Sequence, residues 1–250
     1  MHAPPLPIRA AALGWQPDPL STYCPRCGLA CGPFEAGPEG CSECQSKRPP
    51  WQRIVRLGAY AQPLSTFVHE VKFTRFAALG RGLGALLGAQ LASHLATFAL
   101  TAKGTPWNPD IWLVPVPIST FRRVVRGIDH ARVIAAAAAT HLARSSGLDA
   151  RMCALLARAD RLPQATLPAS ARQENVSGTM RLRHLPGWGT SALLEADPAR
   201  TLIIVVDDVT TTGATLREAC RAIRAAFKAQ DRRPPLLWAG VLSVTEKERL

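Results

Sequence analysis

The chain has 250 residues, which is long enough for one domain of ordinary size or for one domain with a small additional module. Hydrophobic residues make up 47% of the chain and charged residues 19%, a globular composition that excludes an intrinsically disordered protein. Lysine and arginine number 30 against 18 acidic residues, and the resulting net charge of +12 attracts phosphate-bearing partners, either small phosphorylated ligands or nucleic acid. The charge does not distinguish these classes, and scattered arginines on a solvated surface explain it equally well.

The start of the chain lacks the features of a secretory signal. Residues 1–20 contain no continuous apolar run of the required length. We therefore expect a cytoplasmic protein.

Five of the seven cysteines lie within residues 24–44. Cys24 and Cys27 form one CxxC pair, Cys41 and Cys44 form a second, and thirteen residues separate the pairs. Two such pairs can present four thiolates to Zn²⁺ in a tetrahedron, and the metal then supplies folding free energy that so short a segment lacks. Four protein ligands leave no open position for a substrate, so we predict a structural zinc site.

The remaining cysteines leave alternatives open. A disulfide framework is the alternative to zinc, but the missing secretory signal and the odd number of cysteines argue against it. Cys31 either competes as a metal ligand or is spare. Cys153 and Cys220 are predicted to be small core residues.

A boundary follows the cysteines at "KRPPW", residues 47–51, where breaker residues cluster. We place a zinc-binding module in residues 1–50 and one α/β domain in residues 51–250. In chain order the second part predicts strand 53–60, helix 63–72, helix 77–101, strand 111–117, helix 128–146, strand 150–158, irregular chain over 160–195, strand 201–208, helix 215–230 and strand 236–244. This alternation predicts a mostly parallel sheet covered by helices on both faces.

The long helix over 77–101 has a membrane span as its alternative, because residues 82–102 contain no charged side chain. Its polar residues Gln90, Ser93 and His94 favour an amphipathic core helix with no membrane insertion. The same conclusion follows from leucines at helical spacing, namely Leu79, Leu83, Leu86, Leu87, Leu91 and Leu95.

The stretch "VVDDVTTTGAT", residues 205–215, places two carboxylates directly after a continuous apolar strand. Asp207 and Asp208 therefore lie at the carboxyl end of that strand, where open α/β sheets bind ligands. Gly213 allows close backbone approach, and the free N–H groups at the following helix start bind a phosphate. The carboxylates accept hydrogen bonds from sugar hydroxyls or hold Mg²⁺. A phosphorylated sugar satisfies both halves of the motif.

Other uses of an acidic strand end fit less well. A P-loop NTPase needs a Gly-Lys-Ser/Thr phosphate loop, which the chain lacks. An aspartyl phosphatase needs two aspartates one residue apart, whereas adjacent strand residues point to opposite faces. "GRGLGA" at Gly80 is a weak dinucleotide fingerprint that follows no convincing strand.

The stretch "LIIVVDDVTTTGAT" resembles the phosphoribosyl pyrophosphate (PRPP) signature of type I phosphoribosyltransferases. Together with the two CxxC pairs, the chain from Cys24 to Val244 resembles the ComF family of competence proteins, which join a double zinc ribbon to a phosphoribosyltransferase-like domain. Further matches are "VKF" at Val71, "VPVP" at Val114, "RRVVRG" at Arg122 and "RLPQATLPASARQENVSG" at Arg161. The resemblance implies a type I phosphoribosyltransferase-like fold, PRPP as ligand and a role in DNA uptake.

The resemblance also implies roles for individual residues. Asp207 and Asp208 would receive the ribose hydroxyls of PRPP and, with Arg172, form the catalytic set. The 5′-phosphate would be held by Thr210, Thr211, Thr212, Gly213, Ala214 and Thr215. The pyrophosphate would approach Pro117, Ile118 and Ser119. Lys72 either pairs with a phosphate or merely extends from a helix end.

Less specific matches surround these residues. Arg122, Arg123 and Arg126 either bind the pyrophosphate or are solvated on a helix face. The stretch from Arg158 to Gly178, with Gln164, Arg172 and Asn175, lies where the family has a mobile catalytic loop. The prolines of "VPVP" donate no ladder hydrogen bond, which favours a functional turn there.

The chain also departs from the family at one point. It carries "RGIDH", residues 126–130, where the family has "RGFNQ". Asp129 can still cap the following helix.

Two functions of different classes follow. The first is a phosphoribosyltransferase that uses Mg²⁺ with PRPP and an acceptor that the sequence does not identify. The second is a non-catalytic adaptor that binds single-stranded DNA or a competence helicase through its zinc module and its basic surface.

Overall fold

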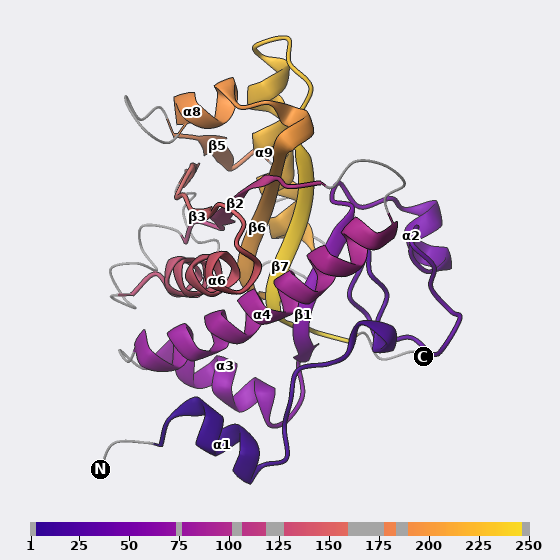
Figure 1. Cartoon of the computed structure of the whole chain (residues 1–250), viewed down its shortest axis with the longest axis vertical. Coiled ribbons are helices and arrows are strands. Elements are labelled where there is room, and N and C mark those ends of the chain that lie inside the picture. The colour runs from indigo at the N-terminus through magenta and orange to yellow at the C-terminus, as the bar shows by residue number, and fades with distance from the viewer. Residues whose placement is uncertain are drawn as a thin grey trace, which may run out of the picture.

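The computed structural model describes residues 4–73, 77–101, 107–118, 128–159, 178–183 and 190–246. Its centre is a five-stranded, wholly parallel sheet in the order β1-β7-β6-β2-β3 (Figure 1). These strands are β1 (Arg53–Ala59), β2 (Asp110–Pro115), β3 (Ala150–Met152), β6 (Thr201–Thr210) and β7 (Leu236–Val244). The α/β fold with a mostly parallel sheet is confirmed.

Helices cover both faces of the sheet. One face carries α3 (Leu64–Phe73), α4 (Ala77–Thr101) and α6 (His130–Ser146), and the other carries α9 (Ala214–Lys228). Along β6, alternate apolar residues enter different cores: Leu202 and Ile204 pack on the α4 and α6 side, and Ile203 and Val205 on the α9 side. Burial on both faces explains why this strand is a continuous apolar run.

The cysteine-bearing segment lies along β1, the end strand of the sheet, on the opposite side of the molecule from α6 (Figure 1). Its elements are the 3-10 turn η1 (Leu20–Thr22) and α2 (Ser42–Ser46), whereas the preceding α1 (Leu6–Ala12) packs on α4 and pairs with α3 through Arg9 and Glu70. Two backbone groups of β1 pair with this segment: Asp18 N–H donates to Leu57 O at 2.7 Å, and Ile54 N–H donates to Pro25 O at 2.8 Å. The module boundary at residue 50 stays a prediction.

The predicted strand over 150–158 is correct at both ends and wrong in the middle, because the segment forms two strands. β3 ends where Cys153 N–H donates to Leu113 O, and Leu155 N–H then bonds Cys153 O in a turn. The chain leaves the central sheet there, and β4 (Leu156–Arg158) pairs antiparallel with β5 (Met180–Leu182). The prediction of irregular chain over 160–195 is also wrong where the structure describes it, since β5 and α8 (Thr190–Glu195) lie within this range.

The proline in β2 has a simple explanation. Val116 N–H donates to Val206 O in β6 at 2.8 Å, so the nitrogen of Pro115 faces the other neighbour, β3. The paired part of β3 ends at Met152, opposite Leu113. Pro115 therefore lies just beyond that pairing, and its missing donor costs the sheet no hydrogen bond.

The glycines of the long helix serve close packing. The "GRGLGA" stretch lies inside α4 and follows no strand, so it is not a dinucleotide turn. A Cβ atom on Gly84 would lie 2.5 Å from the backbone oxygen of Ile134, and one on Gly88 would lie 2.6 Å from that of Ala138. Both contacts are with α6, whose buried face is rich in alanine. Small residues on both helices allow their backbones to approach.

The leucine stripe of α4 is confirmed as the buried side of the helix. Leu83, Leu87, Leu91 and Leu95 are buried, and His94 joins them. No helix in the described part of the chain combines the length and hydrophobicity that a membrane crossing requires.

Replacing Gly84 with alanine should lower the free energy of unfolding by about 1–3 kcal/mol, because the new methyl group meets immovable backbone. Urea unfolding followed by circular dichroism measures the change. Gly82→Ala is the matched control in the same helix, because its methyl group meets only side-chain atoms of Leu6, Cδ2 at 3.0 Å and Cβ at 3.3 Å. It should lower the free energy of unfolding less than Gly84→Ala does, because a side chain gives way more easily than backbone and alanine favours the helix. Equal effects of the two substitutions would contradict the close packing of α4 on α6.

Candidate functional site

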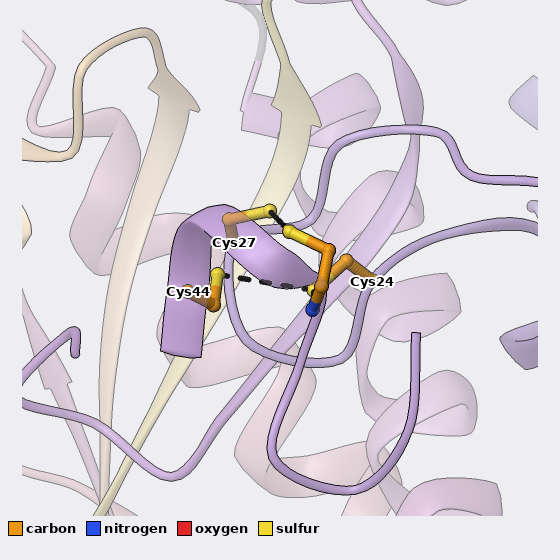
Figure 2. Close-up of side chains that lie close together, drawn as sticks. Cys24, Cys27 and Cys44 are labelled. Carbon is orange, nitrogen blue, oxygen red and sulfur yellow. Dashed lines mark hydrogen bonds between the residues drawn. The ribbon is translucent and has the colours of Figure 1, made fainter. Parts of the chain in front are cut away.

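Cys24, Cys27, Cys41 and Cys44 form one cluster in which all four sulfur atoms lie within 4.8 Å of one another. The Cys24 and Cys44 sulfurs are 3.9 Å apart, as are those of Cys27 and Cys41. Figure 2 shows the sulfurs of Cys24 and Cys44 facing each other, with Cys27 beside them. Four thiolates bound tetrahedrally to Zn²⁺ at about 2.3 Å would be about 3.8 Å apart. The geometry therefore fits a structural zinc ion.

Backbone groups support a negative charge in this cluster. Cys41 N–H donates to Cys24 Sγ at 3.2 Å. The thiol of Cys27 and the backbone amides of Arg26, Cys27 and Cys41 donate to this sulfur. They lower the pKa of Cys24 to about 4, although burial alone would raise it. Burial raises the pKa of Cys44 to about 12. A divalent cation would relieve this conflict by deprotonating all four thiols.

The other cysteines are now placed. Cys31 is not part of the cluster, and its backbone N–H donates to Thr22 O at 3.2 Å. Cys220, on the inner face of α9, is fully buried in the core, as predicted. Cys153 is partly buried against the same core.

The two carboxylates lie where β2 leaves the side of β6. The last paired residue of β2 is opposite Val206, so Asp207 and Asp208 adjoin the loop that begins at Pro117. Each carboxylate accepts from the next backbone amide, Asp207 Oδ1 from Asp208 N–H at 2.9 Å and Asp208 Oδ1 from Val209 N–H at 2.7 Å. These bonds fix both side chains at the end of the sheet.

A cavity of about 280 Å³ opens at this point. It collects predicted residues from three parts of the chain, namely Lys72, Pro117, Ile118, Asp207, Asp208, Thr211 and Thr215. Lys72 Nζ lies 3.4 Å from Asp208 Oδ2, with both side chains mostly buried. Lys72 therefore does not merely extend into solvent.

The electrostatics of the cavity are set by the carboxylate pair. Burial and the neighbouring charge of Asp208 raise the pKa of Asp207 to about 8, while the charges of Lys72 and Arg158 oppose the rise. The carboxylate pair thus carries one negative charge readily, whereas placing a second negative charge beside the first costs free energy. A cation or a group of hydroxyl donors would stabilise the doubly charged pair.

The turn after β6 leads directly into α9. Gly213, at φ +73°, is the residue before the helix and has no side chain with which to cap the first turn. Ala214 N–H, the first of the helix, donates to Thr212 Oγ1 at 3.4 Å. N–H groups at a helix start and neighbouring hydroxyls suit an anion.

Other predicted residues lie elsewhere. Thr210, Thr212 and Gly213 line a second cavity of about 360 Å³, on the side of the turn that faces the cysteine cluster, and Thr211 lines both cavities. The predicted residues outside the described part of the chain are Ser119, Arg122, Arg123, Arg126, Gln164, Arg172 and Asn175.

Two further polar side chains line the cavity of the carboxylates, His130 and Arg158. Sequence analysis did not propose either as a ligand-binding residue. His130 is the first residue of α6, which Asp129 caps by accepting from Arg132 N–H, as predicted. The departure from the family at "RGIDH" was the signal for His130, and the unpredicted pairing of β4 with β5 brings Arg158 to the cavity.

Replacing Cys24 or Cys44 with serine should abolish stoichiometric zinc binding and lower the midpoint of urea unfolding, because three thiolates no longer complete the tetrahedron. Metal released by a thiol-modifying reagent and detected with a chromogenic chelator measures the zinc content. Cys31→Ser is the control and should retain one zinc per chain. Loss of zinc from the Cys31 variant would overturn the assignment of ligands.

Comparison with known proteins completes the description of the site. No family model matches the chain. The chain is 32% identical over 202 residues to "DNA utilization protein YhgH" of Salmonella typhi, an alignment that covers 81% of this chain and 78% of that protein. The protein of the same name from Escherichia coli K12 is 30% identical over the same shares. "Competence protein F" of Haemophilus influenzae is 25% identical, again over 81% and 78%.

These alignments cover most of both chains, and the resemblance seen in the cysteine pairs and in the acidic strand end agrees with them. The chain therefore belongs to the ComF family of competence proteins, with DNA utilization protein YhgH and competence protein F among its members.

Proposed function

We propose that this protein serves DNA utilization, the role that the names of its relatives state, and that it binds PRPP in the cavity at the end of β6. The observation that supports PRPP as the ligand is the adjacency of two carboxylates, a lysine and a helix start around one cavity. PRPP carries sugar hydroxyls between a phosphate and a pyrophosphate. Its charges and its donors match these groups.

Each part of the cavity suits a part of the ligand. The carboxylates of Asp207 and Asp208 accept hydrogen bonds from the ribose hydroxyls. The N–H groups at the start of α9, with the hydroxyls of Thr211 and Thr215, receive the 5′-phosphate. Lys72 and Arg158 remain to balance the pyrophosphate.

The carboxylates also suit Mg²⁺, which prefers oxygen ligands and commonly binds through one or two carboxylates and substrate phosphates. When bound, the metal would neutralise charge on the pyrophosphate. Lys72 already pairs with Asp208, so ligand and metal would compete with this ion pair and redirect the lysine toward phosphate.

Ribosyl transfer is the reaction for which this arrangement is suited. The bond between the anomeric carbon and the pyrophosphate oxygen breaks, pyrophosphate leaves with the electron pair, and a nucleophile of the acceptor bonds to that carbon. The chain's part is to position the sugar and to stabilise the charge on the leaving group. A protein that only senses PRPP would need the same binding residues.

Calorimetric titration of the zinc-loaded protein with PRPP and Mg²⁺ tests the proposal. At about pH 9, above the pKa of about 8 for Asp207, this carboxylate is mostly charged in the free protein. Asp207→Asn should weaken binding by about 10- to 100-fold, the cost of losing hydrogen bonds to a charged group. Asp149→Asn is the control, because this exposed carboxylate lies near the start of β3 and away from the cavity. Absence of PRPP binding by the unaltered protein would refute the proposal.

A second candidate function is that of an adaptor for single-stranded DNA or a helicase. A row of exposed basic residues on α9 favours DNA, formed by Arg217, Arg221, Arg224 and Lys228. Their spacing of four, three and four residues places them on one face of the helix. A groove of about 860 Å³ beside this row also contains Arg181 and Arg183 from the end of β5. Such a surface suits a phosphate backbone.

Charge reversal on this row separates the second function from the first. The double variant Arg224→Glu with Lys228→Glu should weaken binding of a fluorescein-labelled oligothymidylate by about tenfold or more. The slope of the logarithm of the binding constant against the logarithm of the salt concentration should become shallower by about 1.4, or 0.7 per lost phosphate contact. Fluorescence anisotropy at several salt concentrations measures both. The control is Arg132→Glu with Arg144→Glu, which changes the net charge equally on α6, at the other face of the sheet. If both double variants lost the same affinity for the oligothymidylate, the effect would come from the net charge and not from the basic row on α9.

A further inference from the structure

Trp51 joins the cysteine cluster to the sheet. It follows the cysteine-bearing segment directly, is 3% exposed, and donates its indole N–H to the backbone oxygen of Arg26 at 2.7 Å. Arg26 lies between the two cysteines of the first CxxC pair, and its guanidinium donates to Gln52 O at 3.1 Å. A third hydrogen bond joins Ile54 N–H to Pro25 O. The first pair of metal ligands is therefore held to the chain at Trp51.

The far edge of the same indole ring meets the threonine turn. A Cβ atom on Gly213 would lie 3.2 Å from Cη2 of Trp51, so the glycine backbone packs on the ring. The guanidinium of Arg217 lies 5.7 Å from the ring centroid and donates to Thr212 O at 3.1 Å. The ring and the arginine together support the backbone of residues 212–213.

The cavity of about 360 Å³ makes these contacts important. It separates the turn from the cysteine cluster and is lined by Cys27 and Cys44 on one side and by Thr210 and Thr212 on the other. Where the cavity adjoins the turn, few protein atoms pack against the turn. A small number of contacts across such a gap therefore controls where the turn lies.

We propose that Trp51 is a positioning residue for the phosphate-binding turn and that it transmits the metal-bound state of the first cysteine pair to that turn. The inference rests on the proposed function in taking the turn to be a phosphate site. Metal bound by Cys24 and Cys27 holds the carbonyl of Arg26 in place, this carbonyl orients the indole, and the indole supports Gly213. Loss of any link loosens the turn without removing a group that would touch PRPP.

Trp51→Phe tests the role of the indole, because phenylalanine lacks both the N–H donor and the outer edge of the ring that carries Cη2. Trp107→Phe is the matched control, since Trp107 also donates its indole N–H to a backbone oxygen, that of Ala199 at 3.2 Å, far from the turn. Both variants lose one hydrogen bond of the same kind. Urea unfolding and zinc content establish that each variant is folded and metal-loaded.

Amide hydrogen exchange in the segment 209–217 is the first measurement, and it needs no ligand. Exchange there should become about three- to tenfold faster in Trp51→Phe, the change expected for one lost hydrogen bond, and should be unchanged in Trp107→Phe. PRPP affinity, measured by calorimetry, should fall by the same factor only in Trp51→Phe. Unchanged exchange in zinc-loaded Trp51→Phe overturns the inference, whereas lack of PRPP binding with altered exchange refutes only the proposed ligand.

Removing the metal with a chelator tests the second link. Chelation should accelerate exchange in the same segment of the unaltered protein, and it should add less in Trp51→Phe, because the two changes break one chain of contacts. If the effects of chelation and of Trp51→Phe on exchange were fully additive, the metal would act on the turn without Trp51. That result would overturn the proposal that Trp51 transmits the metal-bound state.

Discussion

The alternation of side chains along β6 determines which residues enter each of the two hydrophobic cores and where the two carboxylates lie. Leu202, Ile204 and Val206 enter one core and Ile203 and Val205 the other, and the same alternation continues into the carboxylates. Asp208 pairs with Lys72 from α3, and the positive charges of Lys72 and of Arg158 in β4 both act on Asp207. One rule of strand geometry builds both cores and carries two adjacent acids into a cavity that they share with two cations.

The cysteine-bearing segment attaches to this framework through buried polar contacts. Arg56 of β1 is 1% exposed, donates to Gly28 O at 2.6 Å and pairs with Asp18 at 2.8 Å. Its guanidinium also lies 4.9 Å from the ring of Tyr23, whose hydroxyl is 2.9 Å from Nε2 of His94 in α4. Burial raises the pKa of Tyr23 to about 12 and lowers that of His94 to about 3, so both rings are neutral at physiological pH. The charge that Arg56 carries into this interface is balanced by the carboxylates of Asp18 and, at 3.5 Å, Glu246.

The sequence predicts those elements that repeat a pattern over several turns or alternations. Helix α4 and strand β6 each bury a face with a regular period, and both were predicted within a few residues. The sequence prediction missed β5 and merged β4 with β3, because three residues are too few for a period and the pairing of β4 with β5 joins distant segments. The packing of Gly84 on α6 depends on which helix lies opposite, and a local sequence pattern does not contain that information. In the site, the acids and Lys72 lie near the ends of predicted elements, while the position of Arg158 depends on the pairing of β4 with β5.

The hydrogen bonds from the N-terminal segment to Ile54 and Leu57 have a further consequence for solubility. β1 is the end strand of the central sheet, and an end strand with free backbone groups is a template on which another chain can add. Residues 18 and 25 occupy two of these groups, and the knuckle that carries residue 25 depends on the four thiols for its shape. The cysteine cluster therefore shields a strand edge as well as stabilising a fold. Oxidation of these thiols, or capture of their metal by a competing chelator, would free the edge and favour self-association of the folded protein.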